Sequence, residues 1–148
     1  MKHNKQTVLL VEDNPDDEEL MRLAFSECEF TGKLVVVRDG QDALDYLYAT
    51  GKHLAGGVCD MPQLVLLDLK LPRMNGLEVL KRVREERNTR LLPVVVLTSS
   101  KEEQDLIDSY SLGANSYIQK PVDFCRFAEA ICQLSRYWLA LNEPVYTK

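Results

Sequence analysis

The sequence predicts an α/β protein built on a doubly wound sheet of five parallel strands. Short apolar runs, largely of leucine and β-branched residues, alternate with amphipathic segments, and residues typical of turns separate them. A continuous apolar run of this length is typical of a parallel strand whose two faces are both covered. Because strand and helix alternate five times, a right-handed sheet with helices on both faces is the simplest arrangement.

The five predicted strands differ in the strength of their signal. Four are continuous runs of leucine and β-branched residues, and the fifth is shorter and more polar. We expect the four strong strands at residues 7–11, 34–37, 64–67 and 94–97, and the weaker one at residues 116–118.

The first predicted helix has a clear beginning. Asn14 is a good N-cap, and Pro15 fits the first turn because its fixed backbone angle suits a helix start. Leu20, Leu23 and Ala24 would share one side of this helix, which would be its apolar side.

The other four helices follow from apolar residues at helical spacing. We expect three of them at about residues 41–49, after Gly76, and through Leu106, Ile107 and Tyr110. The last helix is the longest, and its apolar stripe comprises Phe124, Phe127, Ala128, Ile131, Leu134 and Trp138.

Length and composition indicate one globular domain. The chain has 148 residues, of which 45% are hydrophobic, enough for a sizeable core. The net charge of −5 and the pI of about 5.1 give no general attraction to nucleic acid or membrane phosphates. With no secretory signal or apolar run of spanning length, we expect a cytoplasmic protein that binds neither nucleic acid nor membrane. Residues 51–63 would form a surface loop and a candidate partner contact.

The four cysteines are not spaced as a metal or redox motif. They form no C-x-x-C pair, and both histidines lie far from them in the sequence, so a zinc site is not expected. Cys125 and Cys132 are seven residues apart and would share a helix face, which indicates packing. We therefore expect reduced thiols, as is usual in a cytoplasm.

Polar side chains follow the predicted strands at their carboxyl ends. Those ends meet at one edge of a parallel sheet, where ligands bind in this class of fold. Arg38 and Asp39 follow the second strand and have no evident role. The residues that follow the first, third, fourth and fifth strands are Glu12 and Asp13, then Asp68, then Thr98, Ser99 and Ser100, then Lys120.

This set of groups suits a divalent cation and a phosphoryl group. Three carboxylates held together repel one another, and a hard cation such as Mg²⁺ relieves the repulsion. One lysine and one hydroxyl remain to neutralise and hydrogen-bond a phosphoryl group. Asp68, between a metal and a lysine, is then a candidate nucleophile for phosphoryl transfer.

Each of these residues also has a purely structural interpretation. An acid after a strand is most often a helix cap, and we prefer that interpretation for Asp16 and Asp17, which fall in the first turn begun by Asn14. A lone threonine at a strand end is often a packing residue, and a Lys-Pro pair is usually a turn. The joint occurrence of all the groups, at the correct strand ends, favours the functional interpretation.

Four stretches of the chain resemble the receiver domains of two-component response regulators. They are "VLLVEDNPDD", "LVLLDLKLPRMNGLEVL", "VVVLTSS" and "GANSYIQKP", and they are spread over most of the chain, from Val8 to Pro121. The resemblance implies a flavodoxin-like (βα)5 fold and a single receiver domain over residues 1–148. It also implies that Asp68 accepts a phosphoryl group from a histidine kinase. The protein would catalyse its own phosphorylation and dephosphorylation, and would not turn over a separate substrate.

The resemblance also assigns ligands. Mg²⁺ is the implied cofactor, with Mn²⁺ or Ca²⁺ able to substitute. Its ligands would be Asp13, Asp68 and the backbone carbonyl of Lys70, with Glu12 acting largely through a bound water. The phosphoryl group would contact the Thr98 hydroxyl, the backbone N–H of Ser99 and the Lys120 ammonium.

A switch and a backbone feature are implied in the same way. Thr98 would move inward on phosphorylation, and Tyr117 would then rotate from an exposed to a buried position. That rotation would repack the face formed by the fourth helix, the fifth strand and the fifth helix. The bond between Lys120 and Pro121 would be cis.

Further features are similar to the small regulators paired with bacterial phytochromes. They are the long loop before the third strand, "PVVVLTSS", "NSYIQKPVD" and the closing "YWLALNEP". The similarity implies a light-sensing histidine kinase as partner, and a homodimer formed through the fourth helix, fifth strand and fifth helix. Only 28 residues follow Lys120 (148 − 120), so we expect no output domain. Trp138 could anchor a dimer contact or complete the core stripe begun at Phe124.

Three alternatives fit the sequence less well. Haloacid-dehalogenase-like phosphatases also use an aspartate after a core strand, but they need a second acid two residues later, where this chain has Lys70. A flavodoxin-like binding module would need a phosphate-cradling loop after the first strand, which is absent. A phosphorylation-independent, receiver-like scaffold or dimerisation module would be expected to lack an acid, the threonine or the lysine, and the sequence keeps all of them.

Overall fold

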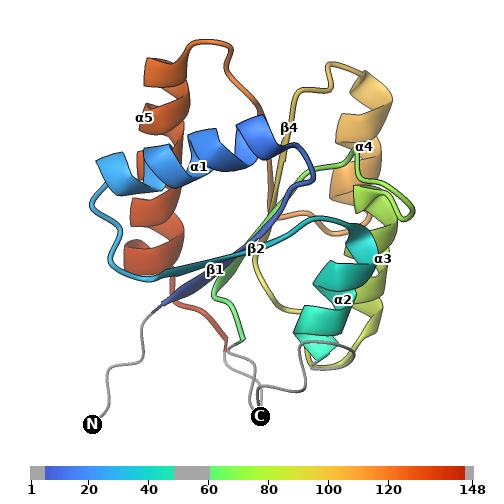
Figure 1. Ribbon diagram of the computed structural model, residues 1–148. Coiled ribbons are helices and arrows are strands. Elements are labelled where there is room, and N and C mark those ends of the chain that lie inside the picture. The colour runs from blue at the N-terminus through green and yellow to red at the C-terminus, as the bar shows by residue number, and fades with distance from the viewer. Residues whose placement is uncertain (1–5, 49–60, 146–148) are drawn as a thin grey trace, which may run out of the picture.

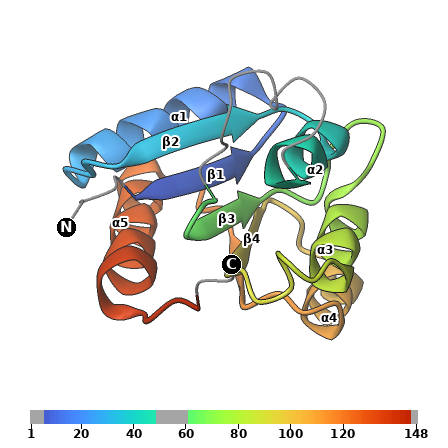
Figure 2. The same cartoon turned by 90° about the horizontal axis from the view of Figure 1, so that it is seen from below.

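Five parallel strands form one sheet in the order β2-β1-β3-β4-β5, as the sequence predicts. The computed structural model describes residues 6–48 and 61–145. Figure 2 shows β2, β1, β3 and β4 side by side. The strand bounds are β1 Thr7–Val11, β2 Lys33–Val37, β3 Leu64–Leu67, β4 Val94–Thr98 and β5 Ser116–Gln119.

The register of the strands brings their carboxyl ends to the same level. Val11, the last residue of β1, pairs with Val37 of β2 on one side and with Leu67 of β3 on the other. Thr98 at the end of β4 pairs with Gln119 at the end of β5. The residues that follow the strands therefore emerge at one edge.

The helices cover both faces of this sheet. In Figure 1, α1 and α5 lie on one side of the strands, and α2, α3 and α4 lie on the other. A π-helical turn, Arg136–Leu141, extends α5. The helix bounds are α1 Pro15–Glu27, α2 Gly40–Tyr48, α3 Gly76–Glu85, α4 Glu103–Ser111 and α5 Phe124–Ser135.

The core lies in two layers because alternate strand residues point to opposite faces. Leu9, Val65 and Val96 face the layer under α2 and α3, while Leu10 and Leu66 face the layer under α1 and α5. Every residue of β1, β3 and β4 is buried, which explains the continuous apolar runs in the sequence. Edge strand β5 is only partly buried, which explains its weaker signal.

The predicted apolar side of α1 is wrong by one position around the helix. Of the three predicted residues, Ala24 is buried as expected, but Leu20 and Leu23 are exposed, and Met21 and Phe25 complete the buried side. Successive helix residues differ by about 100°, so a shift of one residue turns the helix to a different face. The predicted start is confirmed, because the Asn14 side chain accepts hydrogen bonds from the backbone N–H groups of the first turn.

The apolar stripes of α4 and α5 have different outcomes. The α5 stripe packs into the core as expected, and Trp138 and Leu139 beyond it lie partly buried against the same cluster. In α4, by contrast, Leu106, Ile107 and Tyr110 are all exposed. Trp138 thus packs against the core but keeps part of its surface exposed, so a dimer contact through it stays a prediction, and α4 presents an apolar surface.

The expectation of reduced cysteines is wrong for one pair. Cys28, at the end of α1, and Cys132, in α5, form a disulfide across 104 residues of sequence. The two helices pack against each other and bring the Cα atoms to 5.2 Å, a separation that sequence spacing cannot reveal. Cys132 is therefore bonded and does not merely pack beside Cys125, which is free and exposed. Cys59 lies outside the described residues.

Two further expectations concern the backbone. No peptide bond within residues 6–48 and 61–145 is cis, so the predicted cis bond before Pro121 is wrong. An X–Pro bond favours the trans form slightly, and here the trans bond already lets Lys120 reach the acids described below. The predicted loop at residues 51–63 falls mostly outside the described residues. Among the helices that are described, none is long and apolar enough to cross a membrane.

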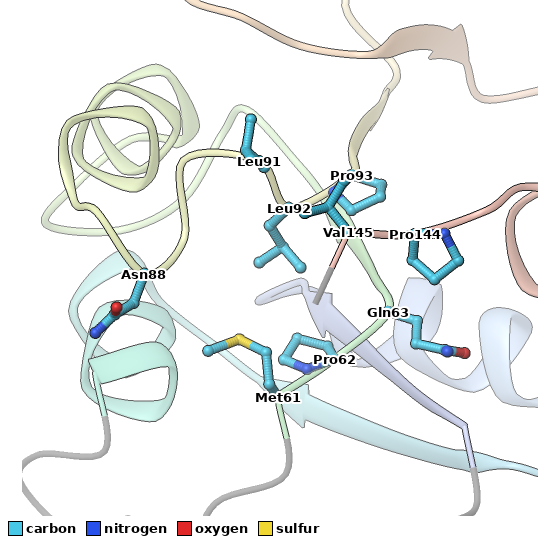
Figure 3. A pocket seen from close by; sticks show the side chains of 9 residues that line it. All are labelled: Met61, Pro62, Gln63, Asn88, Leu91, Leu92, Pro93, Pro144 and Val145. Carbon is cyan, nitrogen blue, oxygen red and sulfur yellow. The ribbon is translucent and has the colours of Figure 1, made fainter. Parts of the chain in front are cut away.

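An apolar pocket lies at the amino edge of the sheet, opposite the strand ends considered above. Figure 3 shows side chains from three segments around it. They come from the residues that lead into β3, from those that lead into β4, and from Pro144 and Val145 near the C-terminus. The lining residues are Met61, Pro62, Gln63, Asn88, Leu91, Leu92, Pro93, Pro144 and Val145.

Candidate functional site

Backbone hydrogen bonds extend the sheet by one residue and fix the side chains that follow the strands. The N–H of Glu12 donates to the carbonyl of Val37 at 3.0 Å, and the N–H of Asp68 donates to the carbonyl of Val11 at 3.1 Å. The N–H of Lys120 donates to the carbonyl of Thr98 at 2.7 Å. The positions of these groups are therefore set by the strands and not by mobile loops.

The ammonium of Lys120 lies at the centre of the site. Its Nζ is 2.8 Å from Glu12 Oε1, 2.8 Å from Asp17 Oδ2 and 3.3 Å from Asp68 Oδ2. A lysine ammonium has three N–H donors, so these contacts use all of them. The Glu12 side chain is 2% exposed, and those of Lys120 and Asp68 are each 11% exposed.

Burial and charge shift the titration of two of these groups. Burial, together with the nearby charge of Asp68, raises the pKa of Glu12 to about 7 despite its hydrogen bond with Lys120. Burial alone would lower the pKa of Lys120. Its hydrogen bonds to Asp17 and Glu12 and the charge of Asp68 outweigh that effect, so the pKa is raised above its ordinary value.

The acids that come together are not quite the predicted set. Within the described chain, the carboxylates close enough to share an ion are those of Glu12, Asp17 and Asp68, whose ligand oxygens lie within 4.8 Å of one another. Asp13 is exposed. The sequence predicts Asp17 only as a helix-start acid and does not predict its place beside Lys120. The missed signal is its position four residues before Met21, on the buried side of α1.

The hydroxyl at the end of β4 is fully buried. Thr98 Oγ1 accepts a hydrogen bond from the backbone N–H of Ser100 at 3.2 Å, and the neighbouring Ser99 is exposed. Ser100 in turn donates from its hydroxyl to Asp105 in α4 at 2.6 Å. These bonds tie the end of β4 to the beginning of α4.

Lys70 and Tyr117 lie at the borders of the site. The Lys70 side chain is exposed, and its backbone N–H donates to Asp68 Oδ1 at 3.1 Å. Tyr117 is half-buried and packs against the core layer under α2 and α3, and burial raises its pKa. The Lys70 amide thus holds one oxygen of Asp68, and the other faces the lysine ammonium.

The acid after β2 has a structural use. Asp39 Oδ1 accepts a hydrogen bond from the N–H of Asp42 at 2.8 Å, which caps α2, and its other oxygen pairs with Arg73. Burial opposes ionisation, but the Asp42 N–H and the Arg73 guanidinium outweigh it and lower the pKa of Asp39. Asp39 is as buried as Asp68 and also follows a strand, but its partners fully account for its charge.

The donor set at Lys120 fits a hard divalent cation. Carboxylate oxygens are the ligands that Mg²⁺ prefers, and three of them converge here. One ammonium cannot neutralise three carboxylates. The pKa of Glu12 is raised chiefly by burial, and the charge of Asp68 adds to that effect. The residues present therefore fit a bound cation at this edge.

Comparisons with known proteins agree with this arrangement. A family model described as "Response regulator receiver domain" matches residues 8–132. The probable methanogenesis regulatory protein FilR2 of Methanothrix harundinacea is 42% identical over 135 residues, which are 91% of this chain and 84% of FilR2. Response regulator Rcp1 of Synechocystis is 33% identical over 134 residues, which are 90% of this chain and 89% of Rcp1.

Solved structures give the same result. The phosphorylated cyanobacterial phytochrome response regulator RcpA superimposes with a TM-score of 0.87 at 34% identity, covering 96% of this chain and 99% of RcpA. The Mn²⁺-bound form of Rcp1 superimposes with a TM-score of 0.85 at 31% identity, covering 95% of this chain and 99% of Rcp1.

The chain belongs to the response regulator receiver family and is homologous to phytochrome-associated regulators. Receiver domains act in two-component phosphorelays with histidine kinases, and the family does not turn over a separate substrate. The acidic cluster, together with the Mn²⁺-bound relative, indicates divalent metal binding.

Proposed function

We propose that this receiver domain accepts a phosphoryl group on Asp68 from a sensor histidine kinase. The observation that supports the proposal most directly is the environment of that carboxylate. Oδ1 accepts the backbone N–H of Lys70 at 3.1 Å, and Oδ2 lies 3.3 Å from the ammonium of Lys120. One oxygen is thus held in place and the other lies beside a group that can neutralise a phosphoryl oxygen.

The transfer is a displacement at phosphorus. An oxygen of Asp68 attacks the phosphorus of a phosphohistidine, the P–N bond breaks, and the histidine nitrogen of the kinase keeps the bonding electrons. Lys120 then pairs with a phosphoryl oxygen. The hydroxyl of Thr98 and the N–H of Ser99 donate to the other phosphoryl oxygens. Both groups lie at the carboxyl end of β4, at the same edge of the sheet as Asp68 and Lys120.

We assign the cation to Mg²⁺. Asp68, Glu12 and Asp13, with the backbone carbonyl of Lys70, would hold it, and Glu12 would act largely through a water. The bound ion would offset the negative charge that builds up on the transferring phosphoryl group. Mn²⁺ or Ca²⁺ would substitute, which agrees with the Mn²⁺-bound form of the relative Rcp1.

The switch and the partners complete the proposal. Thr98 and Tyr117 would carry the change from the phosphoryl group to the face of α4, β5 and α5, and the kinase would be a phytochrome, as the relationship to RcpA supports. The exposed Leu106, Ile107 and Tyr110 of α4 support a homodimer through that face. The cytoplasm is the proposed location.

Intact mass measurement with acetyl phosphate as donor tests the function. We expect wild-type protein to gain one phosphoryl group in the presence of Mg²⁺ and none in EDTA. Asp68→Asn should remain unmodified. The matched control is Asp39→Asn, because Asp39 is equally buried and also follows a strand, but pairs with Arg73.

Two outcomes would contradict the proposal. One is the absence of any adduct on the wild type at high acetyl phosphate and Mg²⁺. The other is an adduct that persists undiminished in Asp68→Asn. If Asp68 proves to be the acceptor, phosphotransfer from a panel of purified histidine kinases then identifies the partner class.

A further inference from the structure

One acid at the site has no part in the function proposed above. Asp17, in the first turn of α1, contacts Lys120 at 2.8 Å, closer than the 3.3 Å between Lys120 and Asp68. The lysine that is proposed to serve the phosphoryl group is thus held more tightly by a helix residue than by the phosphoacceptor. That contact joins α1 to the end of β5, 103 residues apart in sequence.

Asp17 has a second contact in addition to its place in the first turn of α1. Asp16 and Asp17 both donate their backbone N–H groups to the Asn14 side chain, and both favour the positive end of the helix. Asp16 is exposed, however, while the Asp17 side chain is only 34% exposed and points at the ammonium. Asp16 therefore shares the helix-start role without the contact, which makes it a natural control.

We propose that Asp17 is a positioning residue for Lys120 that sets the balance between cation binding and phosphoryl binding. This inference rests on the proposed function, because it assigns Asp17 a part in the same reaction. Asp17 holds the ammonium towards α1 and adds a negative charge to the edge where both ligands would bind.

The two ligands should respond to Asp17 in opposite directions. For a cation, Asp17 is favourable because it adds negative charge and takes up one of the three contacts of the Lys120 ammonium, which it shares with Glu12 and Asp68. For a phosphoryl group, Asp17 is unfavourable because it repels the anion and competes for the ammonium. Loss of the charge should therefore weaken Mg²⁺ binding and strengthen binding of a phosphoryl mimic.

The experiment compares wild type with Asp17→Asn, Asp17→Glu and Asp16→Asn. Amide chemical shifts titrated with Mg²⁺ alone give the cation affinity, and titration with beryllofluoride at saturating Mg²⁺ gives the affinity for the phosphoryl mimic. In Asp17→Asn we expect Mg²⁺ affinity to fall and beryllofluoride affinity to rise, each by about threefold to tenfold, the range expected of a partly screened charge contact. Asp17→Glu should restore both affinities towards wild type, and Asp16→Asn should leave both unchanged.

The outcomes separate this inference from the proposed function. Failure of wild type to bind either Mg²⁺ or beryllofluoride overturns both. Normal binding by wild type, with Asp17→Asn indistinguishable from Asp16→Asn, overturns the role of Asp17 alone. A loss of both affinities in Asp17→Asn also overturns it, because a general disturbance of the helix start would weaken the two ligands together.

Discussion

The amino and carboxyl edges of the sheet are formed by opposite ends of the same strands, and their side chains differ in chemical character. At the amino edge, the residues that lead into β3 and β4 line an apolar pocket with Pro144 and Val145 (Figure 3). At the carboxyl edge, the residues that follow β1 and β3 are the buried acids Glu12 and Asp68. The strands between them are apolar apart from Thr7 at the start of β1, so the difference lies mainly in the residues before and after each strand.

The difference has an energetic consequence. Apolar groups at the amino edge favour folding when they leave water. At the carboxyl edge, Lys120 faces Glu12, Asp17 and Asp68, so full ionisation leaves two negative charges without a partner. We therefore expect the excess negative charge at the carboxyl edge to lower the free energy of unfolding of the metal-free protein. The same charge favours binding of a cation.

Removal of the ammonium gives the largest expected effect. Lys120→Met leaves three carboxylates without a positive charge beside them, and we expect the free energy of unfolding at neutral pH to fall by about 3 kcal/mol. Added Mg²⁺ should recover part of that loss, because the cation would replace the missing positive charge. Urea unfolding with and without Mg²⁺ measures both quantities.

Leu92→Ala at the amino edge is the matched control. Leu92 is buried beside the apolar pocket, and its truncation should cost about 2 kcal/mol. Mg²⁺ should not change that cost. If Mg²⁺ stabilised Leu92→Ala as much as Lys120→Met, the proposed difference between the two edges would be wrong.

Reduction of the disulfide should lower stability without affecting the site. The bond links residues 104 positions apart, and its loss should lower the free energy of unfolding by about 2–5 kcal/mol. Cys28 lies eleven residues after Asp17, about 16 Å along α1, so Mg²⁺ affinity should stay the same.

Thermal unfolding of Cys28→Ser, compared with wild type in the presence and absence of reductant, measures the effect. Cys125→Ser is the control, because Cys125 is free and exposed. If Cys28→Ser and Cys125→Ser unfold alike, the link between α1 and α5 contributes nothing to stability.

The raised pKa of Glu12 predicts a pH dependence confined to the carboxyl edge. Its folded pKa of about 7 lies above the unfolded value of 4.5, so the folded protein binds more protons between these values. Without metal, the stability contributed by Glu12 is full below about pH 4.5 and falls as pH rises through 7.

A cation competes with the same proton. Mg²⁺ affinity should therefore rise about tenfold between roughly pH 6 and pH 8 and change little above that range. Affinity measured at several pH values tests this, and Glu12→Gln should abolish the pH dependence. Substitution of the exposed Glu85 by Gln should preserve it.

The fold could be predicted because its signals are local. Strands buried on both faces are apolar at nearly every position, and the alternation with helices then restricts the topology. The convergence of Glu12, Asp68 and Lys120 followed from the same reasoning, since each comes directly after a strand.

What could not be predicted depends on how the elements pack. The rotation of α1 about its axis decides that Met21 is buried and Leu20 exposed, and the same rotation brings Asp17 to Lys120. The pairing of Cys28 with Cys132 depends on the approach of two helices far apart in sequence. Helical periodicity alone does not fix the rotation of a helix about its axis to better than one residue, about 100°.

The most direct test of the account is a crystal structure with Mg²⁺ and beryllofluoride. We predict beryllofluoride bonded to a carboxylate oxygen of Asp68, with Lys120 and Thr98 as its donors and the cation held by Asp68 together with the acids that follow β1. A structure in which beryllofluoride occupies another residue, or in which the cation avoids the carboxyl edge of β1 and β3, would contradict it.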